Sequence, residues 1–282
     1  MPSKSSRPRK KRKQQGSMEC KKPLDQKECD DLSDAPDGIT VVPEKHSEFI
    51  QWAMSRGVEI DRVTPAMLLG RGMGLQITKS VKKGSRLVFV PAKAMFKPNE
   101  QVLDDKSLNE LSPQARLTVS ALARREVLET WTMTWPTKED IEQCMPLCWD
   151  PSLQGLLPQA AKQVLHRQQA DFAADWAASQ DWCKHNNHSH EDFRYFWLIV
   201  NSRSFHWKPG VTKGGGEYAM CPFLDYMNHG PTGSGCDVIQ TSEGYEVYAE
   251  RDYRKRNHPL SPSHSPSSQH RPLDQQSNSS TI

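Results

Sequence analysis

The sequence predicts an α+β domain that is flanked by a disordered segment at each end. Strand patterns occur on both sides of a long helical stretch, an arrangement typical of this fold class. The 8 Phe, 8 Trp and 6 Tyr residues of the 282-residue chain are concentrated in the middle, whereas both ends are polar. A middle region of about 200 residues is long enough to bury a core. We therefore expect the domain at residues 46–253, with a helical insert at about 97–190.

The elements that precede the insert follow from short local patterns. A helix is expected to begin after the N-cap Ser47 and to stop at Gly57, because the apolar residues between them recur at helical spacing. Strands are expected at residues 75–78 and 87–91, where apolar residues cluster. A turn at residues 83–84 separates these two strands.

Within residues 97–205 the apolar pattern becomes helical, with two stripes at a spacing of about 3.6 residues. The first stripe comprises Val164, Leu165, Phe172 and Trp176. The second comprises Phe193, Phe196, Trp197, Val200 and Ser204, and it follows the acidic pair Glu191 and Asp192. Strands are expected again at about residues 236–239 and 245–249, which completes the strand–helix–strand order.

Both ends of the chain are expected to be disordered. Residues 1–45 are first basic and then acidic, and residues 254–282 are rich in Ser and Pro, so neither segment can bury enough surface to fold. The basic run at residues 4–13 is typical of a nuclear-localisation signal or a nucleic-acid patch, although it could also be a solvated tail. We expect the protein in the nucleus, the cytoplasm or both, with nucleic acid as a partner only through residues 4–13.

Composition excludes a membrane protein, because the apolar runs are far shorter than the stretch that spans a bilayer. The formal net charge is only +3, and the 7 Cys residues are scattered along a chain without an export signal. Reduced thiols in an intracellular protein are therefore expected. Cys144 and Cys148 have no second pair at a matching distance, so we expect no metal site.

Three segments carry residue types that suit binding or catalysis. Residues 70–75 (GRGMGL) allow a backbone to approach a ligand closely or form a tight turn, and their spacing fits neither a dinucleotide nor a phosphate-loop motif. Residues 201–205 (NSRSF) place Arg203 at a helix C-terminus, where its charge also suits the helix dipole. Residues 221–229 (CPFLDYMNH) bring Asp, Asn and His together, in a site or in a loop that hydrogen-bonds itself.

In this order, and with a helical insert between the first two, these segments resemble a SET domain of the Rubisco large-subunit methyltransferase-like class. Residues 49–52 with Gly57, and residues 87–91, 135–136, 146–149 and 245–253, agree with that class. The resemblance covers roughly residues 46–253. It implies SET-domain short-strand sheets with a long helical insert. It also implies an enzyme that transfers a methyl group from S-adenosyl-L-methionine to the ε-amine of a lysine that a protein substrate, histone or non-histone, presents.

The resemblance further implies roles for individual residues. The residues expected to bind S-adenosyl-L-methionine are Arg71, Gly72, Met73, Asn228 and His229. The residues expected to line the substrate side are Arg203 and Asp225. Methyl transfer depends on alignment and charge placement, and the lysine must be neutral, a form that a dry channel favours.

The sequence departs from the family after residue 253. The family continues with an acidic Gly-Glu-Glu segment and a tyrosine motif that orients the lysine amine, whereas residues 254–259 are RKRNHP. We therefore expect a C-terminally truncated member with a catalytic residue that is unknown, and Tyr245, Tyr248 and Tyr253 are not assigned that role. An unpaired sheet edge and marginal stability are expected.

Two other functions compete with methyl transfer. The first is a non-catalytic SET-like interaction module, which the missing tyrosine motif would favour. The second is a nuclear nucleic-acid binder, which rests on residues 4–13 alone and would show steeply salt-dependent binding.

Overall fold

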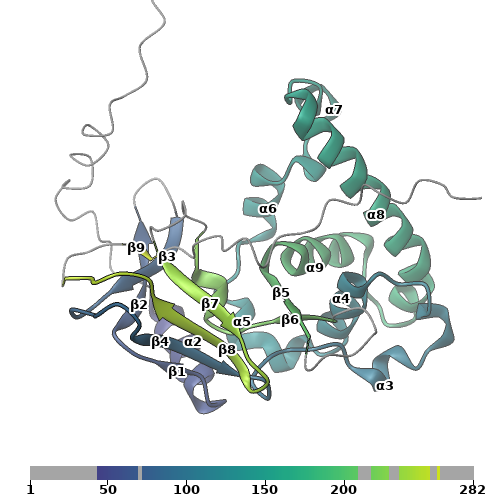
Figure 1. Cartoon of the computed structure of the whole chain (residues 1–282). Coiled ribbons are helices and arrows are strands. Elements are labelled where there is room, and N and C mark those ends of the chain that lie inside the picture. Colours follow the sequence, from purple (N-terminus) through teal and green to yellow (C-terminus); the bar gives the residue numbers. More distant parts are fainter. Residues whose placement is uncertain (1–42, 69–71, 209–216, 229–234, 255–258, 261–282) are drawn as a thin grey trace, which may run out of the picture. The chain divides into compact units, whose positions relative to one another are not determined.

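In this computed structural model the described residues are 43–68, 72–208, 217–228, 235–254 and 259–260, and all of them lie in one unit, residues 39–282 (Figure 1). The strands are β1 (Glu59–Ile60), β2 (Val63–Leu68), β3 (Gly72–Ile77), β4 (Arg86–Pro91), β5 (Ser204–Trp207), β6 (Glu217–Met220), β7 (Cys236–Gln240), β8 (Gly244–Ala249) and β9 (Pro259–Leu260). The longer helices are α2 (Glu44–Ser55), α4 (Pro113–Ala123), α6 (Lys138–Cys144), α8 (Gln159–His185) and α9 (His190–Arg203). The short ones are α3 (Glu100–Leu103), α5 (Glu129–Thr132), α7 (Pro151–Gln154) and the 3₁₀ helices η2 (Lys106–Leu108), η3 (Arg125–Leu128), η4 (Pro146–Cys148) and η5 (Leu224–Tyr226).

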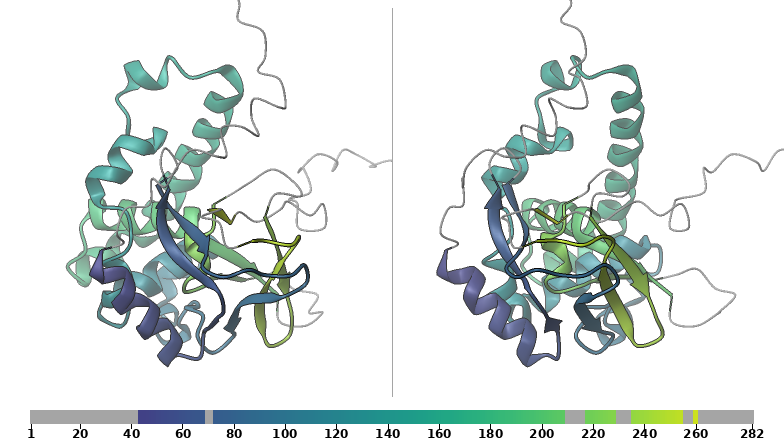
Figure 2. Two further views of the ribbon diagram at one scale, coloured as in Figure 1. Left: turned by 90° about the vertical axis from the view of Figure 1, so that its left-hand side faces the viewer. Right: turned by 60° about the vertical axis from the view of Figure 1, so that its left-hand side comes forward.

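The strands form three small antiparallel sheets with the orders β1-β4-β8-β7, β2-β3-β9 and β5-β6. Strand β4 pairs with β8, so Val88 lies opposite Val247 although the whole helical insert separates them in the sequence. Both views of Figure 2 show these early and late strands side by side, with the helical insert beside them. This mixture of short sheets and helices confirms the α+β class.

Helix α2 begins earlier than the sequence pattern predicts. Its N-cap is Pro43, which makes no side-chain cap, and Ser47 lies within the helix, so the prediction of Ser47 as N-cap is wrong. The apolar face is as expected, because Phe49 and Ala53 are buried. Gly57 follows the helix with φ +92°, a left-handed conformation that glycine adopts without strain.

The helical insert is held together by α9, which packs against α4 and α8. A capping box of Ser189 and Asp192 starts α9, and its apolar stripe is buried as predicted, although Ser204 begins β5 instead of ending the helix. The first stripe is only partly correct. Leu165 is buried, but Val164 is 65% exposed, because adjacent helical positions point in different directions.

A buried carboxylate on α8 ties three segments of the insert to one another. The Oδ1 atom of Asp175 accepts a hydrogen bond from the backbone N–H of Ser112, and its Oδ2 atom accepts one from the Ser112 hydroxyl. The same Oδ2 atom accepts a hydrogen bond from Nε1 of Trp197 at 2.8 Å. This network fixes α8 against α9 and against the start of α4.

The structure differs from the predicted C-terminal tail at residues 259–260. These residues form β9, which pairs with Leu75 and Gln76 of β3, so that edge of β3 is paired where an open edge was expected. Short-range patterns do not reveal such a pairing, because the two strands are far apart in the sequence. In the part of the chain that the structure describes, no helix is both long and apolar enough to cross a membrane.

Candidate functional site

The two residues predicted to line the substrate side lie in direct contact. Arg203 is the last residue of α9 and Asp225 lies in η5, and Nη1 of Arg203 is 3.3 Å from Oδ2 of Asp225. The same Nη1 donates a hydrogen bond to the backbone carbonyl of Asp225 at 3.2 Å. These two contacts with Asp225 hold the guanidinium in one orientation.

The Asp225 carboxylate is buried behind this arginine, with 1% of its side chain exposed against 22% for Arg203. Its Oδ2 atom also accepts a hydrogen bond from Nε1 of Trp131 at 3.0 Å, whereas Oδ1 has no partner among the described residues. Burial raises the pKa of Asp225, and the Arg203 charge partly opposes this effect. In this structure the Asp225 carboxylate therefore contacts Arg203 and Trp131, and its place on the substrate side stays a prediction.

The glycine-bearing strand and the segment after η5 also meet. Nδ2 of Asn228 donates a hydrogen bond to the backbone carbonyl of Met73, in β3, at 2.9 Å. A Cβ atom on Gly74 would lie 2.7 Å from that same Nδ2 atom and 2.6 Å from Cδ1 of Leu68. A side chain at position 74 would therefore displace the side chain of Leu68 and the amide of Asn228, so glycine suits this close approach.

Gly72 and Met73, both predicted to bind the cofactor, lie at the start of β3, where Gly72 is opposite Leu68 in the β2–β3 hairpin. Gly72 has φ +75° and open space where a Cβ atom would stand. Asn228 is described above. The other two residues predicted to bind the cofactor, Arg71 and His229, lie outside the described residues.

The segment that leads into η5 has an unusual backbone. Phe223 has φ +75°, a left-handed conformation that is rare for a residue with a large side chain and that costs about 1–3 kcal/mol. The residue is fully buried and its ring makes an edge contact with Tyr226. Packing therefore holds a strained turn next to Asp225 and Asn228, as is common at functional sites.

Helix α2 supports this segment through a buried pair that the sequence patterns do not reveal. The hydroxyl of Tyr226 and Nδ1 of His46 are 2.7 Å apart. Burial raises the pKa of Tyr226 and lowers the pKa of His46, so both groups are neutral in this pair at pH 7. Phe49 completes the contact, because its ring stacks on Trp131 and meets Tyr226 edge-on.

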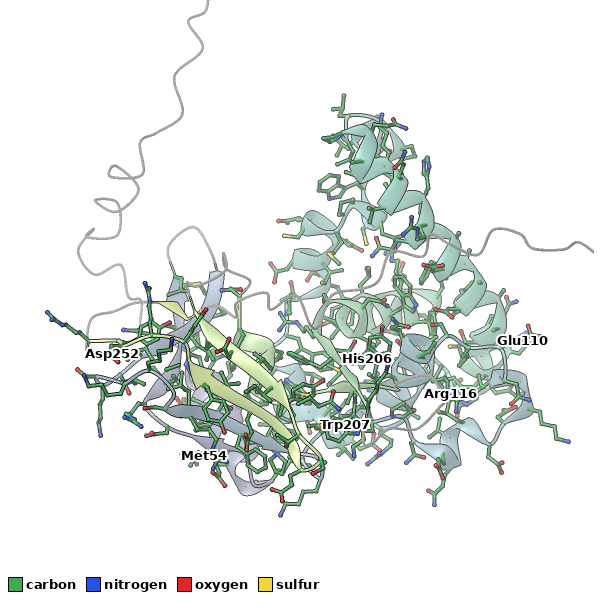
Figure 3. All side chains as sticks on the ribbon, viewed as in Figure 1. Met54, Glu110, Arg116, His206, Trp207 and Asp252 are labelled. Atoms are coloured by element: carbon green, nitrogen blue, oxygen red, sulfur yellow. The ribbon has the colours of Figure 1, made fainter. Side chains whose placement is uncertain are left out.

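The three tyrosines near the end of the domain all use their hydroxyls within the fold. The hydroxyl of Tyr253 donates to the backbone carbonyl of Gly235, and that of Tyr245 donates to the carbonyl of His206 (His206 is labelled in Figure 3). The hydroxyl of Tyr248 donates to the carboxylate of Glu246. These bonds give each tyrosine a structural role.

The cysteines and histidines form no metal-binding cluster within the described ranges: no group of three or more His, Cys, Asp or Glu residues is close enough to hold an ion. Cys144 is exposed and Cys148 half-buried, and both are free thiols. Burial raises the pKa of the Cys183 thiol to about 11, so this cysteine is an unreactive part of the core.

Comparison with known proteins gives one curated relative and a group of solved structures. No protein-family model matches the chain. SET domain-containing protein 4 of Homo sapiens is 23% identical over 241 residues, which cover 76% of this chain and 54% of that protein. The structure of the SET domain of LSMT bound to lysine and AdoHcy has a TM-score of 0.59 at 16% identity, and it covers 80% of this chain and 55% of that chain.

The structure of Rubisco LSMT bound to AdoMet gives a TM-score of 0.60 at 16% identity, over 79% of this chain and 53% of that chain. The chain thus spans about half the length of the proteins that it matches. At these identities the likeness shows the fold, and it confirms the short-strand sheets and helical insert expected from the sequence.

Proposed function

We propose that this chain, which has the SET-domain fold of the Rubisco large-subunit methyltransferase-like class, is an S-adenosyl-L-methionine-dependent protein-lysine N-methyltransferase. The observation that carries the proposal is the hydrogen bond between Asn228 and Met73, which joins two of the three motif segments. The Arg203–Asp225 pair brings in the third segment. The solved structures of similar fold support the proposal, because they hold AdoMet, or AdoHcy and lysine, as ligands.

The residues around β3 fit a cofactor of this chemistry. Open space lies beside the backbone at Gly72, so a flat or extended ligand can approach the chain there without meeting a side chain. The amide of Asn228 offers an acceptor oxygen for an ammonium group, while its nitrogen is held by Met73. When bound, S-adenosyl-L-methionine supplies an activated methyl group. The residues that would hold this cofactor are Gly72, Met73 and Asn228.

On the substrate side, the chain's own contribution is orientation. Arg203 is fixed by two contacts to Asp225, so its guanidinium is placed before any substrate arrives and little rotamer entropy is lost on binding. Such placement of charge is the main contribution that a protein makes to a methyl transfer, because no covalent intermediate on the protein is needed. The substrate protein and the residue that orients its lysine amine are not assigned.

A methyl-transfer assay tests the proposal. The purified chain is incubated with S-adenosyl-L-methionine that carries a labelled methyl group and with a mixture of basic proteins, and label in lysine is measured. We expect lysine methylation, and we expect its rate to fall about tenfold or more in Arg203→Lys. This substitution keeps the positive charge but removes the planar guanidinium group with its paired N–H donors. The matched control is Arg194→Lys, since Arg194 also pairs with a carboxylate, that of Glu142, at 3.2 Å.

The outcomes separate the proposal from the alternative of a non-catalytic module. Labelled lysine in the wild type that persists in Arg194→Lys and falls in Arg203→Lys supports methyl transfer. No label above a blank, with folded protein and bound cofactor, would instead identify a module that binds but does not turn over. An equal loss of lysine methylation in both variants would show that Arg203 is not part of the site.

A further inference from the structure

We infer that a pocket formed by the end of α2, residues 93–97 and the α4–α5 region binds a phosphate group of a ligand or partner. The pocket has a volume of about 120 Å³. Its lining residues are Trp52, Arg56, Lys93, Ala94, Met95, Phe96, Lys97, Arg124, Val127, Leu128 and Trp131. Four of them are cations, and none is acidic.

The four cations have no acidic partner in the described part of the chain. None of the described ion pairs includes Arg56, Lys93, Lys97 or Arg124. Like charges that converge on one hollow repel each other, and this repulsion is relieved when an anion enters. A site with about four positive charges and no carboxylate is therefore suited to a group with more than one negative charge.

Three of these cations are held by aromatic rings. The guanidinium of Arg56 lies 4.2 Å from the centre of the Trp52 ring, and that of Arg124 lies 5.4 Å from the centre of the Phe96 ring. The ammonium of Lys97 lies 5.6 Å from the centre of the Trp207 ring, which is labelled in Figure 3. Cation–π contacts of this kind restrict the side chains before a ligand binds, which reduces the entropy lost on binding.

The fourth cation lies close to the end of α2. A Cβ atom on Gly57 would be 3.2 Å from Cε and 3.6 Å from Nζ of Lys93. Because Gly57 directly follows Arg56, this contact brings the Lys93 ammonium to the end of the helix that carries Arg56. The absence of a side chain at Gly57 leaves room for that approach.

Phosphate fits this set of donors better than a single carboxylate does. Two guanidinium groups offer planar, paired N–H donors that match the oxygens of a phosphate, and the two ammonium groups add point charges. The inner wall is aromatic and aliphatic, with Trp131 and Leu128 buried. A phosphate monoester or diphosphate that enters this pocket would meet positive charge at the rim and an apolar wall behind it.

The pocket is separate from the proposed methyl-transfer site. Its lining includes neither the β3 residues nor Asn228, Arg203 or Asp225. Trp131 contacts both places, because its ring lines the pocket while its Nε1 atom donates to Asp225. Because none of the residues proposed for methyl transfer lines the pocket, phosphate binding can be tested without the proposed catalytic activity.

Calorimetric titration of inorganic pyrophosphate into the full chain, at matched ionic strength in chloride, tests the inference. We expect saturable binding that weakens at least about tenfold in the double variant Arg56→Gln/Arg124→Gln, because two charge-assisted hydrogen-bonding groups are lost. The control is Arg116→Gln, because Arg116 lies in α4 and does not line the pocket (Arg116 is labelled in Figure 3). All three proteins retain the basic residues 4–13, so a difference among them reports on the pocket.

Pyrophosphate binding that is lost only in the double variant supports the inference. No saturable binding by the wild type overturns it, and binding that is equal in wild type and double variant overturns the location. A competition arm then distinguishes the sources of phosphate. Displacement of pyrophosphate by a phosphoserine peptide, but not by free phosphoserine, identifies a phosphorylated protein, whereas equal displacement by both identifies a small phosphate ester. Displacement by neither overturns the assignment of phosphate monoesters.

Discussion

The side-chain amide of Asn228 donates a hydrogen bond to the backbone carbonyl of Met73 at 2.9 Å, so the segment after η5 is fixed to strand β3. The approach is close enough that Gly74 cannot carry a side chain without displacing this amide. Two motifs that are more than 150 positions apart in the sequence are joined by this one contact. The proposed cofactor site depends on it.

Gly74→Ala should destabilise the protein and weaken cofactor binding. The new Cβ atom would lie within 3 Å of Leu68 Cδ1 and Asn228 Nδ2, and overpacking of this kind costs about 1–3 kcal/mol. The measurement is the midpoint of chemical unfolding. Leu68→Ala in the same chain should recover part of the loss, because it removes one of the two contacts.

Gly72→Ala provides the contrast for this prediction. It introduces strain at φ +75° but meets no neighbour, so its effect should not be changed by Leu68→Ala. If Leu68→Ala fails to rescue Gly74→Ala, or rescues both variants equally, crowding is not the reason for glycine at position 74.

Arg203→Ala should destabilise the protein in a pH-dependent way. It leaves the buried Asp225 carboxylate without its cation, a change that costs about 3–5 kcal/mol when the carboxylate is charged. Burial already raises the pKa of Asp225, and loss of the Arg203 charge raises it further. The destabilising contribution of Asp225 in the variant is therefore smallest where Asp225 is protonated, and it grows as the pH rises through the raised pKa.

The free energy of unfolding is measured for wild type and Arg203→Ala at pH 5 and at pH 8. The difference between the two proteins, the gap in stability, should be larger at pH 8 than at pH 5. Asp225→Asn in the variant should narrow that gap, because it removes the buried charge. A gap that is the same at both pH values would show that the pair acts only through packing.

Tyr226→Phe should cost about 1–2 kcal/mol of unfolding free energy, since it removes the buried hydrogen bond to His46. A double-mutant cycle with His46→Ala isolates this pair from the surrounding ring contacts. We expect a coupling energy above about 0.5 kcal/mol. Additive effects of the two substitutions would show that α2 is held to η5 by ring packing alone.

Acid should weaken the start of α9 through Asp192. Burial opposes ionisation of this carboxyl, but hydrogen bonds from Lys138 and Ser189 lower its pKa to about 2. A carboxylate with a lowered pKa stabilises the fold above pH 4, and this contribution is lost as the pH falls from about 4 to about 2. Asp192→Asn should therefore reduce the steepness of acid unfolding in that range, whereas the exposed Asp171→Asn, in α8, should not.

The sequence predicts much of the central fold, because hydrophobic periodicity is a local signal. The stripe on α9 and the strands β4, β7 and β8 follow from it directly. Strands β2, β5 and β6 are missed, since their short segments carry no clear alternation and gain stability from partners in the fold. The pairing of β9 with β3 is missed for the same reason.

The site is predictable as a set of motifs but not as a set of contacts. Through the family resemblance, the sequence indicates five described residues as candidate binding residues: Arg203, Asp225, Gly72, Met73 and Asn228. It does not reveal that Asp225 is buried, because the cover comes from Trp131 on another helix. The His46–Tyr226 pair is missed likewise, although its aromatic neighbours on α2 are visible as a stripe. Long-range packing decides these features, and no local pattern encodes it.

Calorimetric titration of S-adenosyl-L-methionine into the chain and two asparagine variants tests the proposed cofactor site directly. Asn228→Ala removes the amide beside β3, while Asn201→Ala removes an amide that donates a comparable hydrogen bond, at 2.8 Å, to the carbonyl of Trp197 on α9. We predict saturable binding to the wild type and to Asn201→Ala, and binding about tenfold or more weaker to Asn228→Ala. If folded wild-type protein does not bind the cofactor, the chain has no such site. If Asn228→Ala binds the cofactor as tightly as the wild type, the Asn228 amide is not part of the site.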